Sequence, residues 1–439
     1  MKVAFYCPNK NLKNINFKNP HIGNLGCGAT EYLQVAIPYM LKLYYGDLFE
    51  TILIADYKNN LPSFIDSLEV KNGLSEAIIK ANEENVDIFV FKPSEKEGEK
   101  VFNLLDLYKL NSIAIGQLNP FPKCINLLSE CDFIKAFVCV GLNQYDQLID
   151  TKLSKKLFQI NNPITDNLVS SLKDSKTFEK RKDIVYMGAL YPQKNFHYLA
   201  KNWKKISKFI PSAKLHVIGS ADTYGGNRKL GIYGLAEPTY ESLFMKALQK
   251  DKVSANKVVF HGNLNKEKYD FFANCRVGIV NPLGNTETCC VSAVEMQAFG
   301  LPVCTGNYQA LRTTILNNKS GLLSNNQLKF RKNILKVYTQ KDLFEKLSYG
   351  SILNAKLNFS FSQIINKWYF LFYKIYADQK IDIPHKPSFR SRKLSFIYFI
   401  RLVNKFLFKG IFGIKSGSVI VASHYLKDFK KWLFKKFFK

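Results

Sequence analysis

Short apolar runs recur along the chain, and longer segments of mixed apolar and polar residues separate them. In the first 150 residues the apolar runs are 3–6, 51–55, 86–91, 112–116 and 136–141. Segments such as 30–45 and 75–85 are long enough for helices. Continuous apolar strands that alternate with helices predict a parallel sheet that is covered on both faces.

The alternation stops near 161–163 and then starts again. The second set of apolar runs is 183–187, 214–219, 257–262, 276–280, 301–305 and 321–323. A chain of 439 residues is long enough for two domains that each have a core. We therefore predict an α/β protein with two doubly wound, Rossmann-like domains. Ligands of such sheets bind at the carboxyl ends of the strands, so two facing domains would enclose a cleft.

The C-terminal part of the sequence has a different character. Residues 359–376 predict a long aromatic helix, and residues 381–439 form a basic tail with 14 Lys or Arg and two acidic residues. Basic and aromatic residues alternate in this tail with rough helical periodicity. A cationic helix face beside Phe, Leu and Trp is typical of an interfacial helix, so we expect residues 385–439 to contact an anionic membrane surface.

The alternative for the tail is a solvated helix that packs its aromatic residues on the rest of the protein. The net charge of +28 and the aromatic content also suit single-stranded nucleic acid. A nucleic-acid binder would need this charge along a groove, whereas much of it lies in the tail. We therefore expect no nucleic-acid partner.

The nine cysteines indicate the compartment. Their odd number and the lack of a C-x-x-C pair favour reduced thiols over a disulfide framework or a zinc site. The N-terminus enters a predicted strand at residue 2, so we expect no signal peptide. Because no run of about 20 apolar residues exists, we expect no membrane-spanning helix. The sequence thus predicts a cytoplasmic protein, peripheral on the cytoplasmic face of the inner membrane.

Two glutamates eight residues apart, Glu287 and Glu295, flank the start of a predicted helix. Eight residues turn an ideal helix by about 800°, which leaves two side chains about 80° apart. They reach one ligand only if Glu287 lies in the loop and the helix N-terminus points between them. Such a terminus offers unpaired N–H groups and a positive dipole end, which suits a phosphate. The motif therefore predicts a ligand with a diphosphate and hydroxyl groups, such as a nucleotide-sugar.

Four other segments follow predicted strands and carry glycines or cations: 23–28, 188–194, 219–229 and 261–264. Glycines let the first of these loops approach a ligand closely. Lys194 lies in the turn after the first strand of the second domain, at the mouth of the predicted cleft. A cation there would neutralise a diphosphate leaving group. Each segment taken alone is also compatible with an ordinary surface loop.

In this order, the segments resemble the GT-B retaining glycosyltransferases of family 4. Glu287 and Glu295 resemble the E-x7-E signature of that family, and Ala-Phe-Gly-Leu-Pro-Val at 298–303 resembles its continuation. The turn at 188–194 resembles the motif G-R-L-x-P-x-K-G, and His-Gly-Asn-Leu at 261–264 resembles a strand-end motif. The resemblance covers roughly the first 376 residues.

The resemblance implies a division of the chain into four parts. Residues 1–165 would form an acceptor domain, and residues 166–358 a nucleotide-sugar donor domain. Residues 359–380 would be a helix that crosses back onto the first domain, and residues 381–439 are the basic tail.

The resemblance also implies roles for individual residues. Glu287 would hold hydroxyls of the donor sugar, Glu295 the ribose, and Lys194 the diphosphate, so that Glu287 and Lys194 would be the catalytic residues. The implied donor-binding residues are Glu295, Gly188, Thr288, Cys289, Cys290, Val291, Arg228, Lys229, Asn263 and Leu264. The implied acceptor and phosphate loop comprises Gly26, Cys27, Gly28 and Asn119.

The chain departs from the family pattern at two places. Ala189 stands where the family has an arginine, and Arg228 or Lys229 would supply the missing charge. The segment 115–120 has no histidine, so the sequence identifies no acceptor-side base. The resemblance implies retention of anomeric configuration by front-face attack, in which the leaving phosphate helps to deprotonate the acceptor. We expect no cofactor and no metal ion.

The sequence thus predicts an enzyme that transfers a sugar from a nucleoside-diphosphate-sugar to a glycan or lipid-linked acceptor. The abundance of Lys, Asn, Ile and Phe suggests an AT-biased bacterial genome, and hence surface polysaccharide or lipopolysaccharide biosynthesis. One alternative is a non-catalytic GT-B partner subunit that binds lipid or another transferase. Another is a sugar-nucleotide epimerase. The motifs do not distinguish among UDP, GDP and ADP as the nucleotide of the donor.

Overall fold

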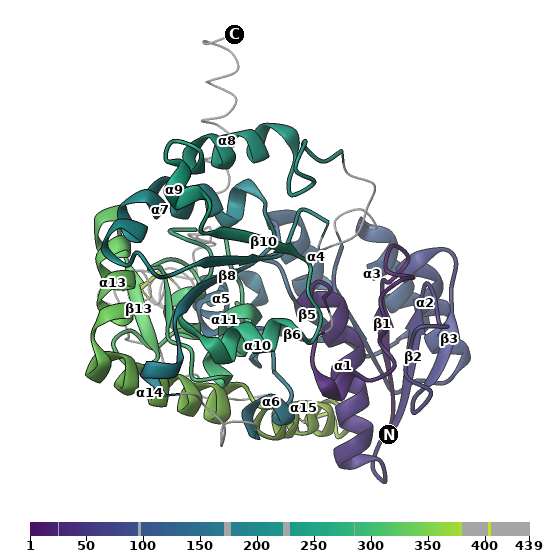
Figure 1. The fold of residues 1–439 in the computed structure, drawn as a ribbon. Helices are drawn as coiled ribbons and strands as arrows, with labels where there is room; N and C mark the ends of the chain where they lie inside the picture. Colours follow the sequence, from purple (N-terminus) through teal and green to yellow (C-terminus); the bar gives the residue numbers. More distant parts are fainter. Residues whose placement is uncertain are drawn as a thin grey trace.

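The computed structural model describes residues 1–24, 26–94, 98–170, 177–222, 229–284, 286–379 and 403–404. In this part of the chain two α/β domains lie side by side (Figure 1). Each domain is built on one sheet of parallel strands, which confirms the predicted fold class of two doubly wound, Rossmann-like domains. The tail at 385–439, predicted to contact a membrane, lies outside the described residues apart from 403–404.

The sheet of the first domain has seven strands in the order β3-β2-β1-β4-β5-β6-β7. The strands are β1 (Lys2–Cys7), β2 (Glu50–Ala55), β3 (Asp66–Glu69), β4 (Ile88–Phe91), β5 (Ser112–Gly116), β6 (Ile134–Cys139) and β7 (Leu157–Gln159). Five of them were predicted from apolar runs. The pattern missed β3 and β7, because β3 is a half-exposed edge strand of sequence Asp-Ser-Leu-Glu and β7 has three residues.

Helices cover both faces of this first sheet. They are α1 (Ala29–Tyr45), α2 (Gly73–Glu83), α3 (Gly98–Tyr108), α4 (Pro122–Glu130) and α5 (Leu142–Leu148). Successive residues of a strand point to opposite faces. In β1, Val3 and Phe5 join a core with α1, whereas Ala4 and Tyr6 join a core with α2, α3 and α4. The two cores account for the unbroken apolar sequence of the central strands.

The sheet of the second domain has six strands in the order β10-β9-β8-β11-β12-β13. The strands are β8 (Asp183–Met187), β9 (Leu215–Ile218), β10 (Val258–Gly262), β11 (Cys275–Ile279), β12 (Val303–Gly306) and β13 (Gly321–Ser324). The helices are α6 (Asp166–Ser170), which precedes the sheet, α7 (Phe196–Phe209), α8 (Pro238–Leu248), α9 (Lys252–Ala255), α10 (Lys268–Asn274), α11 (Val291–Ala298), α12 (Leu311–Thr314), α13 (Gln327–Thr339) and α14 (Lys341–Phe359). One core contains α7, α8 and α13, and the other contains α10 and α11.

The chain crosses between the domains twice, and the two crossings are paired. Ile164 N donates to the Phe359 carbonyl at 2.8 Å, and Phe361 N donates to the Ile164 carbonyl at 3.0 Å. After the second crossing, α15 (Phe361–Tyr376) packs beside α1 on the first domain (Figure 1). Its Trp368 and Phe372 each lie 6.1 Å from the ring of Phe5, between ring centroids.

The apolar face of α15 explains why the chain returns to the first domain. Seven of its side chains are buried in the first-domain core, and each large apolar side chain contributes about 1.5–3 kcal/mol on full burial. None of the described helices is long and apolar enough to cross a membrane.

Candidate active site

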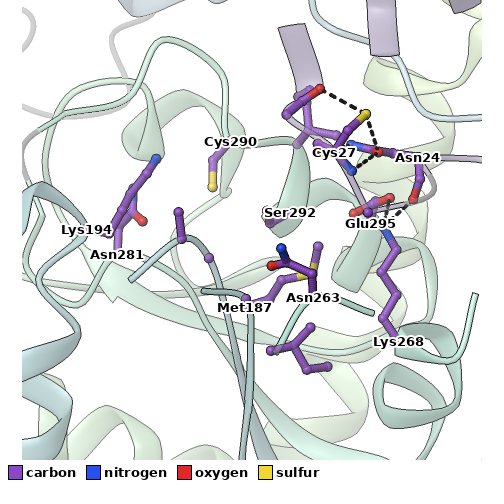
Figure 2. A pocket seen from close by; sticks show the side chains of 18 of the residues that line it. Asn24, Cys27, Met187, Lys194, Asn263, Lys268, Asn281, Cys290, Ser292 and Glu295 are labelled. Atoms are coloured by element: carbon purple, nitrogen blue, oxygen red, sulfur yellow. Dashed lines mark hydrogen bonds and ion pairs between the residues drawn. The ribbon is translucent and has the colours of Figure 1, made fainter. Parts of the chain in front are cut away.

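The strand order reverses between β1 and β4 in the first sheet and between β8 and β11 in the second. At such a reversal the connections leave to opposite faces, which opens a crevice outside the carboxyl ends of the strands. A pocket that is partly open to solvent lies at this place in the second domain. Gly188 follows β8 and Asn281 follows β11, and both line the pocket. Residues of the first domain close its other side (Figure 2).

Close backbone packing forms the floor of the pocket. Gly219, after β9, has φ +115°, and a Cβ atom there would lie 2.4 Å from the Gly188 carbonyl oxygen. Only glycine permits the two loops to come this near each other. The turns after β8 and β9 therefore leave space above them for a ligand.

Glu287 is held by two side chains on one side of the pocket. Its Oε1 accepts a hydrogen bond from Lys194 Nζ and another, at 2.5 Å, from Asn281 Nδ2. Lys194 ends a short 3-10 turn, Pro192–Lys194, in front of α7. The side chains of Lys194 and Glu287 are 19% and 11% exposed, so solvent still reaches the pair. A carboxylate and an ammonium group thus face the pocket together from two different loops.

Glu295 is held by a second lysine on the other side of the pocket (Figure 2). Lys268 Nζ lies 2.9 Å from Glu295 Oε1, and the Tyr269 hydroxyl donates to the same oxygen at 3.4 Å. Lys268 and Glu295 are 1% and 2% exposed. Burial, together with the nearby Glu295 carboxylate, raises the pKa of Tyr269 far above its ordinary value. The tyrosine therefore stays a neutral hydrogen-bond donor.

Two cysteines lie between Glu287 and Glu295 in the sequence. Cys289 and Cys290 line the pocket immediately before α11 and are buried. Burial raises the pKa of Cys289 to about 12 and that of Cys290 well above its ordinary value. A protonated thiol is a poor nucleophile. The two cysteines therefore provide small neutral walls beside the start of α11.

The first domain contributes a loop that carries glycines, at residues 23–24 and 26–28. Asn24 closes this loop on itself, because its side chain donates to the Cys27 carbonyl at 2.9 Å and accepts from Cys27 N at 3.2 Å. Gly26 has φ +84°, and a Cβ atom there would lie 2.5 Å from Asn265 Oδ1 of the second domain. The loop is thus packed tightly across the interface.

Most of the residues that the sequence singled out lie around this one pocket. Those that line it are Gly26, Cys27, Gly28, Gly188, Lys194, Asn263, Leu264, Glu287, Cys289, Cys290, Val291 and Glu295. Thr288 does not line it, because its hydroxyl donates to the Gln117 carbonyl of the first domain at 2.7 Å. Asn119 and the exposed Lys229 also lie away from the pocket lining. Arg228 lies outside the described residues.

Among the site residues whose hydrogen bonds hold the two glutamates or the glycine-bearing loop, the sequence did not single out Lys268, Asn24 and Asn281. Asn281 had a signal, because it follows an apolar strand and precedes a proline. Asn24 lies within the glycine segment. Lys268 had none, because a lysine that ends a polar run such as Asn-Lys-Glu-Lys at 265–268 is usually exposed to solvent. Among the described residues, no group of three or more His, Cys, Asp or Glu side chains is placed to hold a metal ion.

Residues 170–352 match the family described as glycosyl transferases group 1. Among solved structures, a glycosyltransferase from Rickettsia africae ESF-5 has a TM-score of 0.63 and 14% identity, over 85% of this chain and 98% of that one. Sucrose-phosphate synthase from Thermosynechococcus elongatus has a TM-score of 0.61 and 12% identity, over 86% and 100%. Anabaena HepE in complex with UDP and glucose has a TM-score of 0.60 and 13% identity, over 85% and 100%. The comparison with curated protein sequences gave no match.

The fold and the pocket between the sheets define a protein of the GT-B architecture found in glycosyltransferases. Over residues 170–352 its sequence is similar to the glycosyl transferases group 1.

Proposed function

We propose that the protein transfers a sugar from a nucleoside-diphosphate-sugar to an acceptor hydroxyl. The observation that carries this proposal is the pocket at the strand reversal, in which two glutamates and two lysines surround the start of α11. A diphosphate suits Lys194 and the backbone N–H groups near the helix start, and hydroxyl groups suit the two carboxylates. The complex of Anabaena HepE with UDP and glucose supports the same class of ligand.

In the proposed reaction the bond between the sugar anomeric carbon and the diphosphate oxygen breaks as the acceptor oxygen bonds to that carbon. The acceptor attacks the same face of the sugar from which the diphosphate departs, so the anomeric configuration is retained. The acceptor proton passes to the leaving phosphate. Lys194 would stabilise the charge that develops on the diphosphate, and Glu287 would hold sugar hydroxyls. Stabilisation of developing charge by groups already in place is usually the largest contribution to such catalysis.

The acceptor is proposed to be a glycan or a lipid-linked glycan of a bacterial surface polysaccharide or lipopolysaccharide. The basic aromatic tail at 385–439 supports this choice, because such a sequence favours the anionic surface where lipid-linked acceptors reside. We infer that the enzyme acts in the cytoplasm, peripherally on the membrane and without a metal ion. Deletion of 385–439 should abolish salt-sensitive binding to anionic vesicles, and a tail that is dispensable for that binding would contradict the inference.

Thermal unfolding with UDP, GDP, ADP and their sugars tests the donor site. A ligand at about one hundred times its Kd stabilises the folded state by about 2.7 kcal/mol. We expect one nucleotide class to raise the unfolding temperature of the wild type and to lose this effect in Glu295→Gln. Glu241→Gln is the matched control, because Glu241 is also 2% exposed and bonded but lies outside the pocket lining.

A nucleotide effect in the wild type and in Glu241→Gln, but not in Glu295→Gln, supports the proposal. The absence of an effect from every nucleotide would overturn it and favour a non-catalytic partner subunit.

A further inference from the structure

Lys268 is one of the most deeply buried charged residues among the described residues, and it touches both domains. Its Nζ lies 2.9 Å from Glu295 Oε1 and donates to the Asn24 carbonyl, 244 residues away, at 2.8 Å. The ammonium group also lies 5.1 Å from the ring centroid of Tyr269. One lysine thus joins the donor-side carboxylate to the glycine-bearing loop of the first domain (Figure 2).

A buried ion pair is a poor way to gain stability, since apolar side chains of similar volume often serve as well. Lysine is almost never fully buried unless it is paired. The geometry of this pair gives it another use. Lys268 and the Tyr269 hydroxyl both bond to Oε1 of Glu295, which fixes the plane of the carboxylate within the pocket lining. A carboxylate fixed in this way is preorganised to accept two neighbouring hydroxyl groups.

The contact with Asn24 has a second consequence. Asn24 holds Cys27 through its side chain, and its backbone carbonyl accepts a hydrogen bond from Lys268 Nζ. A Cβ atom at the neighbouring Gly23 would lie 2.4 Å from the Tyr269 hydroxyl oxygen. The loop therefore closes against the same two residues that orient Glu295.

We propose that Lys268 is a positioning residue with two tasks: it orients Glu295 toward the ribose hydroxyls of the donor, and it fastens the first-domain loop over the donor pocket. This inference rests on the proposed function, because it requires a nucleotide in the pocket. Lys268 acts through Glu295 and Asn24 and does not itself touch the sugar that is transferred.

The test compares binding of UDP, GDP and ADP with binding of their 2′,3′-dideoxy counterparts by calorimetry. We expect the wild type to bind one ribonucleotide at least about tenfold more tightly than its dideoxy form, because the hydroxyls make charge-assisted hydrogen bonds. In Lys268→Met this ratio should fall to about twofold or less, since Glu295 loses the group that orients it. A merely structural role would lower the unfolding temperature and leave the ratio unchanged.

Two further variants make the test specific. Lys156→Met is the control, because Lys156 is half-buried and donates to the backbone carbonyls of Leu128 and Cys131 but lies outside the pocket lining. In Lys156→Met, the ratio between ribonucleotide and dideoxynucleotide affinity should equal that of the wild type. Asn24→Ala loosens the loop but leaves the Lys268–Glu295 pair. It should therefore lower the affinity for the ribonucleotide and for its dideoxy form by the same factor. If Lys268→Met does not fold, Lys268→Leu, which also lacks a hydrogen-bond donor, is used instead, and its ratio should likewise fall to about twofold or less.

A ratio in the Lys268 variants that equals or exceeds the wild-type ratio would overturn the proposal. Equal binding of ribo and dideoxy forms by the wild type would also overturn it, while leaving a nucleotide site in place. If the wild type binds no nucleotide at all, the proposed function fails instead.

Discussion

Glutamine in place of Glu287 removes a carboxylate and keeps nearly the same side-chain size. Lys194 Nζ and Asn281 Nδ2 both donate to Oε1 of this carboxylate. A diphosphate that binds to Lys194 must therefore compete with Glu287 for the same ammonium group. Removing the competitor should strengthen nucleotide binding even though it removes a group of the active site.

The burial of the pair sets the size of this effect. A hydrogen bond to a charged group is worth about 1.5–3 kcal/mol, but side-chain exposures of 11% and 19% allow solvent to screen this pair. We take about 1.4 kcal/mol, which corresponds to a factor of about ten in Kd. Glu287→Gln should thus bind the preferred nucleoside diphosphate about tenfold more tightly than the wild type. Lys194→Met should bind it at least about tenfold more weakly.

Titration calorimetry at one fixed ionic strength measures both changes, because salt screens such interactions. Glu130→Gln is the control, since it removes a glutamate from an exposed pair with Lys152 in the first domain. This control should change Kd by less than about twofold. If Glu287→Gln binds the nucleotide as weakly as Lys194→Met, the two side chains hold the ligand together and do not compete for it, and the reasoning is refuted.

Three further predictions concern stability. Gly26→Ala should lower the free energy of unfolding in urea by about 1–3 kcal/mol. Gly234→Ala should lower it less, because both glycines have positive φ but only a Cβ atom at Gly26 would meet Asn265. Equal losses would contradict a role for the contact between Gly26 and Asn265. Trp368→Ala should cost about 3–5 kcal/mol by leaving a cavity under α15, and a loss below about 1 kcal/mol would contradict its anchoring role. Burial raises the pKa of Asp183, but hydrogen bonds from His216 and from the backbone N–H of Lys214 outweigh this effect and lower the pKa below its ordinary value, so this carboxylate stabilises the fold above its unfolded pKa of about 3.9. Asp183→Asn should be less stable than the wild type at pH 7, with a difference in unfolding free energy that narrows as pH falls below about 4, and a difference independent of pH would contradict this assignment.

The sequence was sufficient where local pattern and tertiary role coincide. Strands such as β1 and β8 are buried on both faces, so their apolar runs predict their places in the sheets. Glu287 and Glu295 could be assigned to one pocket because Glu287 lies in the loop that joins β11 to α11 and Glu295 lies in α11 itself. The turn that carries Lys194 could be added because such turns meet at the same edge of the sheet.

The sequence was insufficient where a residue's partner comes from a distant segment. Lys268 is a cation in a polar segment, and only the packing of the two domains makes it a buried partner of Glu295 and of Asn24. Thr288 belongs to the acidic motif, but the nearby Gln117 carbonyl draws its hydroxyl toward the first domain. Such contacts depend on the relative placement of two domains, which local periodicity does not encode.

Hydrogen–deuterium exchange with the stabilising nucleoside-diphosphate-sugar tests the central claim most directly, because it locates the ligand. We predict slower exchange on binding in the segments 187–194 and 286–296 of the second domain and in 23–28 of the first. Strands far from the pocket, such as β3 and β13, should exchange at unchanged rates. Protection confined to other segments, with these three unchanged while the ligand is bound, would contradict a donor site between the two sheets.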